Sequence, residues 1–521
     1  MVSSKKFFQP IDTVALTAML VLSVLILILL WSGDHTTPRV RAFSWQDKLV
    51  SADDAGFILT FSRPMNHASV EENLRINPPI PGKISWAGRR MAYTPLNPVP
   101  YGGEYQLQLE KAIDQFSTQR QGESMELFTA SFRTRDRAFA YIGVEGKEKG
   151  RLILYNLTQQ KKTVLTPSDL VVTDFKPYPD GERILFSATT ANTQEQNLLS
   201  RQLYNVTTGI SFRSSQRSSS STPAPGILDL VLDDQEYQNL KFDLSADGQT
   251  IVVQRVKRGE LASGLEPWII KPNAKSPESL PQPLGAIGGD FVITPDSNSL
   301  ALLKGKGTAI LPLSIEQKSS TNQQQDFLPQ FGQVLSFARD GSQAAMVSFN
   351  EDNPQLRYIR SLFLVANHGL EQELLRTKGL IKSCEFSPNQ ENLYCLLTDL
   401  TQGEQYLEEQ PFLVAINLKM ATTMDELPQQ WWKQPSVKWV VPLVHQQDIH
   451  MSLSPDGLAL LFDQVFTSIP SANDTLKTDE GQAIATSLLW LLPLDNNTAA
   501  DNLNQLKPEQ LLPGFHPRWL R

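Results

Sequence analysis

The segment MSLSPDGLALLF, residues 451–462, carries the pattern that organises the rest of this 521-residue chain. Ser454-Pro455-Asp456-Gly457 lies between two runs in which apolar residues alternate with others. Proline presets φ at the second position of a turn, aspartate binds the backbone that follows it, and glycine accepts positive φ. Alternating apolar residues on both sides can then pair as antiparallel strands. The segment therefore predicts a tight β-hairpin.

Further copies of this hairpin occur between residues 176 and 396. Successive turns are 44 to 67 residues apart, and each hairpin is followed by a third and a weaker fourth strand. Repeats of about 40 to 50 residues with four strands each are typical of β-propeller blades. Because each turn belongs to a different blade, we interpret the turn residues as structural and not as catalytic carboxylates. These residues are Asp180, Gly181, Asp247, Gly248, Asp296, Asp340, Gly341, Asn389, Asp456 and Gly457.

The blade count follows from two incomplete pieces at the ends of residues 138–521. Phe139–Ile142 resembles the second half of a hairpin without its first half, and Gly514–Leu520 resembles a first strand without a second. One blade built from both ends accounts for both pieces and removes two exposed sheet edges. The sequence thus predicts an all-β chain whose C-terminal strand closes a seven-bladed β-propeller, with a six-bladed ring as the fallback.

Residues 38–135 show a different pattern, with short period-two stretches and a turn every 8 to 12 residues. The clearest predicted strands are residues 57–61, 83–86, 91–94, 105–109 and 128–133. About seven such strands in a segment of this length are typical of an immunoglobulin-like β-sandwich. We therefore expect a small Ig-like domain over residues 38–135, ahead of the propeller.

Both regions also resemble known bacterial families. The ordered series Phe61-Ser62-Arg63-Pro64-Met65, Trp86, Tyr93-Thr94-Pro95 and Phe132-Arg133-Thr134 resembles the SbsA-type Ig-like domain. The hairpin consensus over residues 138–521 resembles the TolB-type, WD-like propeller repeat, although Ser297 and Gln390 replace the turn glycine in two copies. These resemblances imply a spacer module followed by a propeller that binds proteins in the bacterial cell envelope.

The amino terminus predicts a membrane anchor. Lys5 and Lys6 precede the 18-residue apolar stretch Val14–Trp31, about the shortest length that crosses a hydrocarbon core. A cleavable signal peptide is the alternative, but its apolar region is normally about 7 to 15 residues long. We therefore expect a cytoplasmic segment over residues 1–13 and a transmembrane signal-anchor helix over residues 14–31. This predicts a single-pass protein of the inner (cytoplasmic) membrane with its body in the periplasm.

Few residues offer metal, cofactor or catalytic chemistry. A net charge of −8 without a basic run argues against a nucleic-acid partner. The six histidines lack metal-ligand spacing, and no nucleophile elbow or phosphate loop occurs, so we expect no metal and no cofactor. Cys384 and Cys395 should face each other across the hairpin around Asn389. A disulfide and a pair of small buried hydrophobes both fit, and a disulfide would favour an exported protein.

Trp431, Trp432 and Trp439 lie in an insertion between the turns at Asn389 and Asp456. Tryptophan is enriched where partners bind, so these residues are candidates for a partner contact. Packing against the outer strand of the blade is the alternative.

These features predict a membrane-anchored envelope scaffold and not an enzyme. Its Ig-like spacer would hold the propeller for a protein, peptide or polysaccharide partner. A structural or adhesive surface protein is the first alternative. A hydrolase or lyase in the central funnel is the weaker one, because it needs several polar side chains converging from the inner strands. The first-strand residues, such as Phe242, Phe291 and Met451, are mostly apolar.

Overall fold

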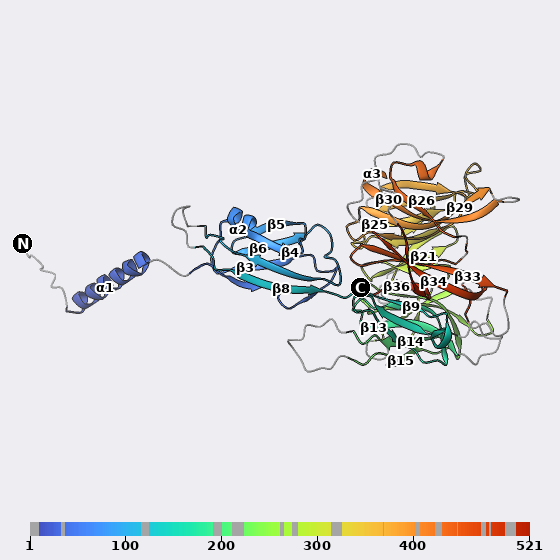
Figure 1. Ribbon diagram of the computed structural model, residues 1–521, viewed down its shortest axis with the longest axis horizontal. Helices are drawn as coiled ribbons and strands as arrows, with labels where there is room; N and C mark the ends of the chain where they lie inside the picture. Colours follow the sequence, from blue (N-terminus) through green and yellow to red (C-terminus); the bar gives the residue numbers. More distant parts are fainter. Residues whose placement is uncertain are drawn as a thin grey trace, which may run out of the picture.

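The computed structural model shows a chain built almost entirely of antiparallel β-sheet (Figure 1). It describes residues 10–32, 37–115, 124–190, 201–210, 223–260, 265–272, 280–313, 326–367, 369–402, 407–421, 430–444, 446, 448–469, 476–478, 481–494 and 507–521. Within these residues the strands form nine four-stranded sheets. The all-β prediction is confirmed, and the many four-stranded sheets are consistent with a propeller.

A helix, α1 (Pro10–Ser32), precedes the sheets and overlaps the predicted signal anchor over residues 14–31. Crossing a bilayer requires a helix of about 20 predominantly apolar residues. Among the residues that the structure describes, no helix meets this requirement of length and hydropathy. The predicted single-pass location in the inner membrane is therefore wrong.

Two sheets pack face to face over residues 40–134 and share one apolar core (Figure 1). Trp45 lies at its centre, with its ring edge-on to Phe57 and Phe132 at centroid distances of 5.3 and 5.0 Å. One sheet contains β1 (Val40–Phe43), β3 (Phe57–Phe61), β6 (Arg90–Pro95) and β5 (Gly82–Ala87). The other contains β2 (Leu49–Val50), β8 (Phe128–Thr134), β7 (Glu104–Leu109) and β4 (Leu74–Asn77). A short helix, α2 (His67–Asn73), begins where the Asn66 side chain accepts the Ser69 N–H. We call this unit the sandwich.

Six of the remaining seven sheets follow one another along residues 170–513, each with neighbouring strands in chain order. Their strands are β12 (Leu170–Pro177), β13 (Arg183–Thr190), β14 (Gln202–Thr207) and β15 (Leu228–Leu232); β16 (Tyr237–Leu244), β17 (Ile251–Lys257), β18 (Glu266–Ile270) and β19 (Gln282–Pro283); β20 (Phe291–Ile293), β21 (Ser299–Lys304), β22 (Gly307–Pro312) and β23 (Asp326–Leu328). They continue with β24 (Gln333–Phe337), β25 (Gln343–Ser348), β26 (Arg360–Ala366) and β27 (Glu371–Thr377); β28 (Ile381–Phe386), β29 (Asn392–Gln402), β30 (Leu407–Asn417) and β31 (Val437–Pro442); β32 (Met451–Leu453), β33 (Ala459–Ser468), β34 (Ala483–Pro493) and β35 (Glu509–Pro513).

One further sheet joins the two ends of residues 138–519. It has the order β11 (Lys161–Val164), β10 (Leu152–Asn156), β9 (Ala138–Ile142) and β36 (Phe515–Trp519). The C-terminal strand β36 is antiparallel to β9, with Phe515 opposite Ile142 and Trp519 opposite Phe139. The short helices η1 (Gly146–Glu148), α3 (Leu418–Ala421) and η3 (Trp431–Lys433) lie between strands of the sheets.

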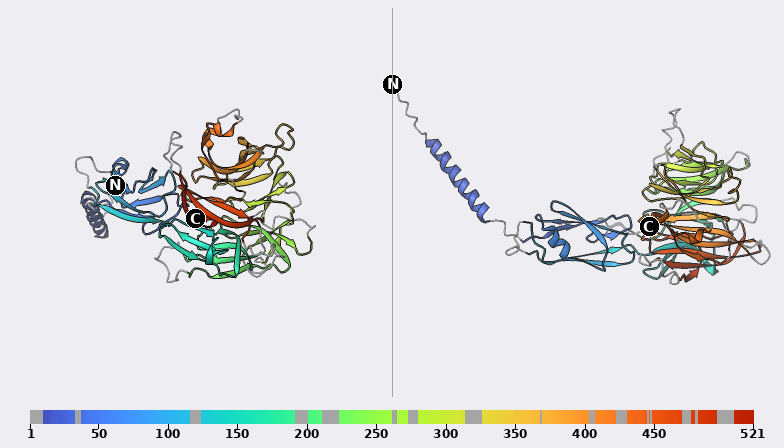
Figure 2. Two further views of the ribbon diagram at one scale, coloured as in Figure 1. Left: turned by 45° about the vertical axis from the view of Figure 1, so that its right-hand side comes forward. Right: turned by 90° about the horizontal axis from the view of Figure 1, so that it is seen from above.

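Neighbouring sheets meet through their first strands. β36 contacts β12 and β32, β16 contacts β20, β20 contacts β24, β24 contacts β28, and β28 contacts β32. β12 and β16 are joined by an ion pair between Lys176 and Asp243. Figures 1 and 2 show these sheets side by side in one body, with the sandwich attached to one side of it.

The hairpins pair as their sequences predict. Met451 lies opposite Phe462 and Leu453 opposite Leu460, so the apolar residues of both strands share a face. Ser297 and Gln390, which replace the turn glycine, take up positive φ of 62° and 57°. The turns therefore keep one geometry, at the cost of placing a side chain where glycine is favoured.

Candidate functional site

The predicted turn residues all lie at the same end of their sheets, and the sandwich sits against that end. We call it the turn face (Figure 2). The guanidinium of Arg339 donates to the Ala52 carbonyl at 3.0 Å. The Asn389 side-chain amide donates to the Asn97 side-chain oxygen at 2.9 Å. Asp456 binds the sandwich as well, so three different sheets hold it.

Asp456 is the most enclosed of these contacts, with 1% of its side chain exposed. One carboxylate oxygen serves its own turn, where it accepts the Ser454 hydroxyl at 2.6 Å and the Leu458 N–H at 3.2 Å. The other accepts the Tyr101 N–H of the sandwich at 2.9 Å and lies 3.4 Å from the Arg137 guanidinium. The same carboxylate therefore shapes its turn and fixes the sandwich. Sequence reasoning assigned it the first role only.

Other turn aspartates serve the turn that contains them. Each accepts the backbone N–H two residues further on, at 2.9 to 3.1 Å, as an Asx turn requires. These are Asp180, Asp247, Asp296 and Asp340. The turn glycines Gly181, Gly248, Gly341 and Gly457 have φ between 67° and 74°.

A set of charged and polar residues lies where the first strands meet. We call it the axial belt and define it as Asp174, Lys176, Lys241, Asp243, Asp290, Glu385, His450, Asp463, His516 and Arg518. It corrects the prediction of a mostly apolar inner surface. Phe242 and Phe291 are indeed buried, but Lys241 and Asp243 flank Phe242, and Asp290 precedes Phe291. Period-two alternation places the two kinds on opposite faces.

One part of the belt links successive sheets by ion pairs. Lys176 pairs with Asp243, and Lys241 pairs with Asp290. Asp243 also accepts the Ile293 N–H of the next sheet at 2.9 Å. Burial alone would raise the pKa of Asp243, but the Lys176 ammonium and these hydrogen bonds hold it below its ordinary value. This carboxylate is therefore ionised at neutral pH and joins two sheets.

A second part of the belt gathers two histidines. The rings of His450 and His516 stack with centroids 4.0 Å apart. The fully buried Asp463 accepts the backbone N–H of both residues at 2.7 Å and lies 3.1 Å from His450 Nδ1. Arg518 Nε donates to His516 Nε2 at 3.1 Å, and Asp174 lies 3.4 Å from the same nitrogen. Burial, with the charges of its neighbours, lowers the pKa of His516 well below its ordinary value, so this ring is neutral.

Sequence reasoning missed this pair because the two residues come from different sheets and only the meeting of β36 with β32 brings them together. His516 has φ of 54°, and the β36–β9 register shifts between Phe515 and Arg518. A bulge with positive φ at a residue other than glycine costs about 1 kcal/mol and is frequent at functional sites. No signal in the sequence marks it.

Glu385 closes the belt on the side of β32. Its carboxylate accepts the Leu453 N–H of the next sheet at 3.0 Å. Burial raises the pKa of Glu385 above its ordinary value despite this bond. A small pocket beside the belt is lined by Asp290, Gln333 and Thr308. In the part of the chain that the structure describes, no three potential ligand side chains gather in a way that would hold a metal ion.

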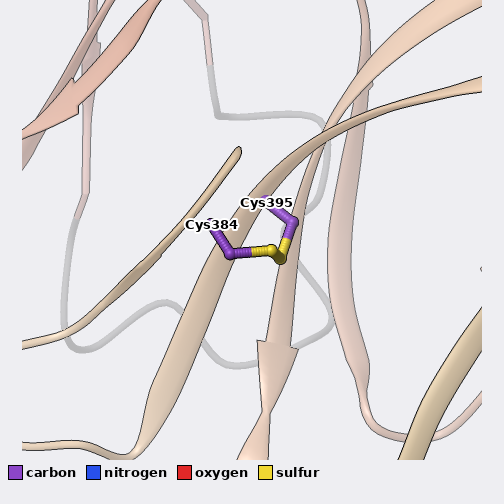
Figure 3. Close-up of a disulfide and its surroundings, with 2 residues drawn as sticks. All are labelled: Cys384 and Cys395. Atoms are coloured by element: carbon purple, nitrogen blue, oxygen red, sulfur yellow. A yellow bond between two sulfur atoms is a disulfide. The ribbon is translucent and has the colours of Figure 1, made fainter. Parts of the chain in front are cut away.

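The two cysteines form a disulfide across β28 and β29 (Figure 3). Cys384 lies opposite Cys395 in the register, with their Cα atoms 4.1 Å apart. Close spacing of this kind is typical of a non-hydrogen-bonded pair. Of the two readings left open by the sequence, the structure has the bonded one, and both residues are buried.

The three candidate tryptophans do not form one exposed surface. Trp431 is buried, and its indole N–H donates to Asp399 at 3.0 Å. Trp439 packs against Tyr394 with a centroid distance of 5.9 Å. Trp432 alone among the three is exposed. Of the two readings left open by the sequence, packing within the sheet therefore applies to the buried Trp431 and the partly buried Trp439, and Trp432 stays a candidate for a partner contact.

The end of the sheets away from the sandwich carries several exposed apolar side chains. We call it the distal face and follow it by the chain direction, since β29 and β33 run away from the turn face and end there (Figure 1). β30 begins at the distal face, close to where β33 ends. The exposed residues are Tyr358, Leu407, Val444 and Ile469.

Comparisons with known proteins identify no family. No family model matches the chain, and no curated protein matches it. Among solved structures, TolB from Acinetobacter baumannii is similar over 66% of this chain and 77% of its own, with 12% identity and a TM-score of 0.34. A putative TolB from Agrobacterium tumefaciens covers 54% of this chain and 86% of its own, with 10% identity and a TM-score of 0.33. A periplasmic gluconolactonase from Pseudomonas aeruginosa covers 74% of this chain and 99% of its own, with 12% identity and a TM-score of 0.42. Likeness at this level is too low to support an argument about function.

Proposed function

We propose that the protein is a binding scaffold without catalytic activity, in which the distal face takes a polypeptide partner. The observation that carries this proposal is the occupation of the turn face by the sandwich. Loops at the two faces are where a propeller binds its ligands. With Asp456 and Asn389 already bonded to the sandwich, the distal face is the one left for a partner.

In this proposal the seven sheets of residues 138–519 are the blades of a ring, and β36 closes the ring. Support comes from the pairing of β36 with β9 and from polar bonds between neighbouring blades. Glu385 accepts the Leu453 N–H, and the Ser452 hydroxyl accepts the Trp519 N–H at 3.2 Å. In a six-bladed ring β36 would be a tail, and the second of these bonds would have no role.

We also propose, from the resemblances in the sequence, that the sandwich is an SbsA-type Ig-like spacer and that the ring is a TolB-type propeller. The ordered aromatic series in the sandwich supports the first assignment. Phe61, Tyr93 and Phe132 belong to this series and are buried in the sandwich core. The shared turn geometry of the hairpins supports the second.

The distal face has the chemistry of a protein contact. Leu407 and Ile469 stand on adjacent long hairpins with 59% and 91% of their surface exposed. Exposed apolar side chains that cluster on one face of a soluble unit mark interaction sites. The axial belt, in contrast, is occupied internally, because Asp243, Asp290 and Asp463 each bond to another part of the chain. An enzyme in the funnel would need such groups to face a substrate.

The test compares two sets of substitutions in the full chain. The distal variant carries Leu407→Ser and Ile469→Ser. The control carries Ile58→Ser and Leu127→Ser, which are exposed on the sandwich. Each immobilised protein is incubated with extract of the source cells, and retained polypeptides are cross-linked and identified. We expect a polypeptide that the wild type and the control retain equally and that the distal variant loses at least about tenfold. Equal retention by both variants would refute the distal face as the binding surface, and loss only in the control would favour the adhesive alternative.

A further inference from the structure

A buried arginine lies on β17, within the sheet of β16 to β19 and near its distal end. Arg255 stands on β17, opposite Asn239 on β16 and Glu266 on β18. β17 runs from the turn face towards the distal face, and Arg255 is two residues from its end. Its side chain is 94% removed from solvent, with 6% exposed.

The guanidinium of Arg255 is held in one orientation. Its centre lies 4.4 Å from the Tyr237 ring and 5.1 Å from the Trp268 ring. Its Nε donates to the Asn239 side-chain oxygen at 3.1 Å. Asn239 is fixed in turn, because its amide donates to the Arg201 carbonyl at 2.7 Å. Two aromatic rings and one hydrogen bond therefore position the group before any ligand arrives.

The two terminal nitrogens of the Arg255 guanidinium have no hydrogen-bond acceptor among the described residues. Burial lowers the pKa of Arg255 below its ordinary value, as expected for a desolvated charge without an anionic partner in contact. The neighbouring Arg258, in contrast, is paired with an anion: it donates to the Asp234 carbonyl at 2.7 Å and to the Asp234 carboxylate at 2.8 Å. The Nε of Arg201, the residue whose carbonyl accepts from Asn239, is buried without a hydrogen-bond partner.

We propose that Arg255 is the centre of a carboxylate-binding site at this edge of the distal face. A carboxylate has two coplanar oxygens that match the two terminal nitrogens of a guanidinium. The two aromatic rings pack against each other, with centroids 5.0 Å apart, and shield the side of the guanidinium that they share from water. Asp233 and Glu236 lie close enough to act on Arg255 electrostatically, and both are exposed. Their negative charge disfavours a doubly charged phosphate more than a singly charged carboxylate.

The carrier of the carboxylate is a polypeptide, either at its C-terminus or through an acidic side chain. This assignment rests on the proposed function, which places a polypeptide partner on the same face. The carboxylate site itself does not depend on it, since a free carboxylate should bind alone. The two can therefore fail separately.

The test uses the full-length protein with sodium acetate as the probe and sodium chloride at equal ionic strength as the blank. Saturation transfer from the protein to the acetate methyl group reports binding. We expect transfer in the wild type and in Arg258→Lys, and at least about a fivefold loss in Arg255→Lys, because lysine cannot make two parallel bonds. A second measurement needs no variant: the Arg255 Nε–H resonance of the wild type should shift saturably with acetate, while that of Arg258 should not.

Three outcomes would overturn the site. Equal transfer in Arg255→Lys and the wild type would show that acetate binds elsewhere. Equal shifts of the Arg255 and Arg258 resonances would reduce the effect to ionic strength. Displacement of acetate by an equal concentration of inorganic phosphate would exclude carboxylate selectivity.

Discussion

Replacing Asp456 by asparagine should loosen the sandwich without unfolding the sheets. Asparagine keeps one oxygen for the Ser454 hydroxyl and the Leu458 N–H, so the turn survives. Its amide group then faces the Tyr101 N–H, donor against donor, in a site with 1% of the side chain exposed. A hydrogen bond to a charged group contributes about 1.5 to 3 kcal/mol, and the partly exposed Arg137 pair adds little. We expect the junction to lose about 2 to 3 kcal/mol.

Hydrogen exchange measures this loss at the junction itself. A change of about 2 to 3 kcal/mol should speed exchange of the Tyr101 amide about 30- to 150-fold, if it opens with the junction. Asp340→Asn is the matched control, because the Asp340 carboxylate binds Ser342 within its own turn. Unchanged exchange at Tyr101 in Asp456→Asn, or an equal increase in the control, would refute the assignment of Asp456 as the residue that fixes the sandwich.

Further predictions concern the disulfide, the buried histidine and the tryptophans. Reducing the Cys384–Cys395 disulfide should lower the free energy of unfolding by about 2 to 3 kcal/mol, measured by urea unfolding with and without reductant; no difference would contradict this. The lowered pKa of His516 means that the unfolded chain takes up this proton first, so stability should fall as the pH drops below about 6.5, by up to about 1.4 kcal/mol per pH unit. His516→Gln should remove this part of the slope, and an unchanged slope would assign it to other groups. Trp431→Ala should destabilise by about 3 to 5 kcal/mol because the ring is buried, whereas the exposed Trp432 should tolerate alanine within about 0.5 kcal/mol; equal thermal shifts would contradict the burial.

The hairpins could be predicted from the sequence because they depend on local chemistry. Proline, aspartate and glycine restrict the backbone within four residues, and period-two apolar runs set the register of the flanking strands. The pairing of Leu453 with Leu460 and of Cys384 with Cys395 follows from counting outward from the turn. The predicted membrane anchor rested on hydropathy over residues 14–31 and failed against the described helix.

The candidate sites could not be predicted from the sequence in the same way. Arg255 is an ordinary strand residue in the sequence, and only the fold places Tyr237 and Trp268 over its guanidinium. The axial belt was missed for a related reason. Its members alternate along the first strands with apolar residues such as Phe242. These apolar residues, and not the polar ones beside them, were assigned to the inner surface from the sequence.

The sequence by itself determined the class of fold, the hairpin registers and the facing of the two cysteines, because each depends on interactions between residues close in the chain. Only the tertiary structure decided which groups share a site. His450 meets His516, and Asp456 meets Tyr101, across long stretches of chain. Such contacts depend on how whole sheets are placed, and no local preference of the backbone or side chains encodes them.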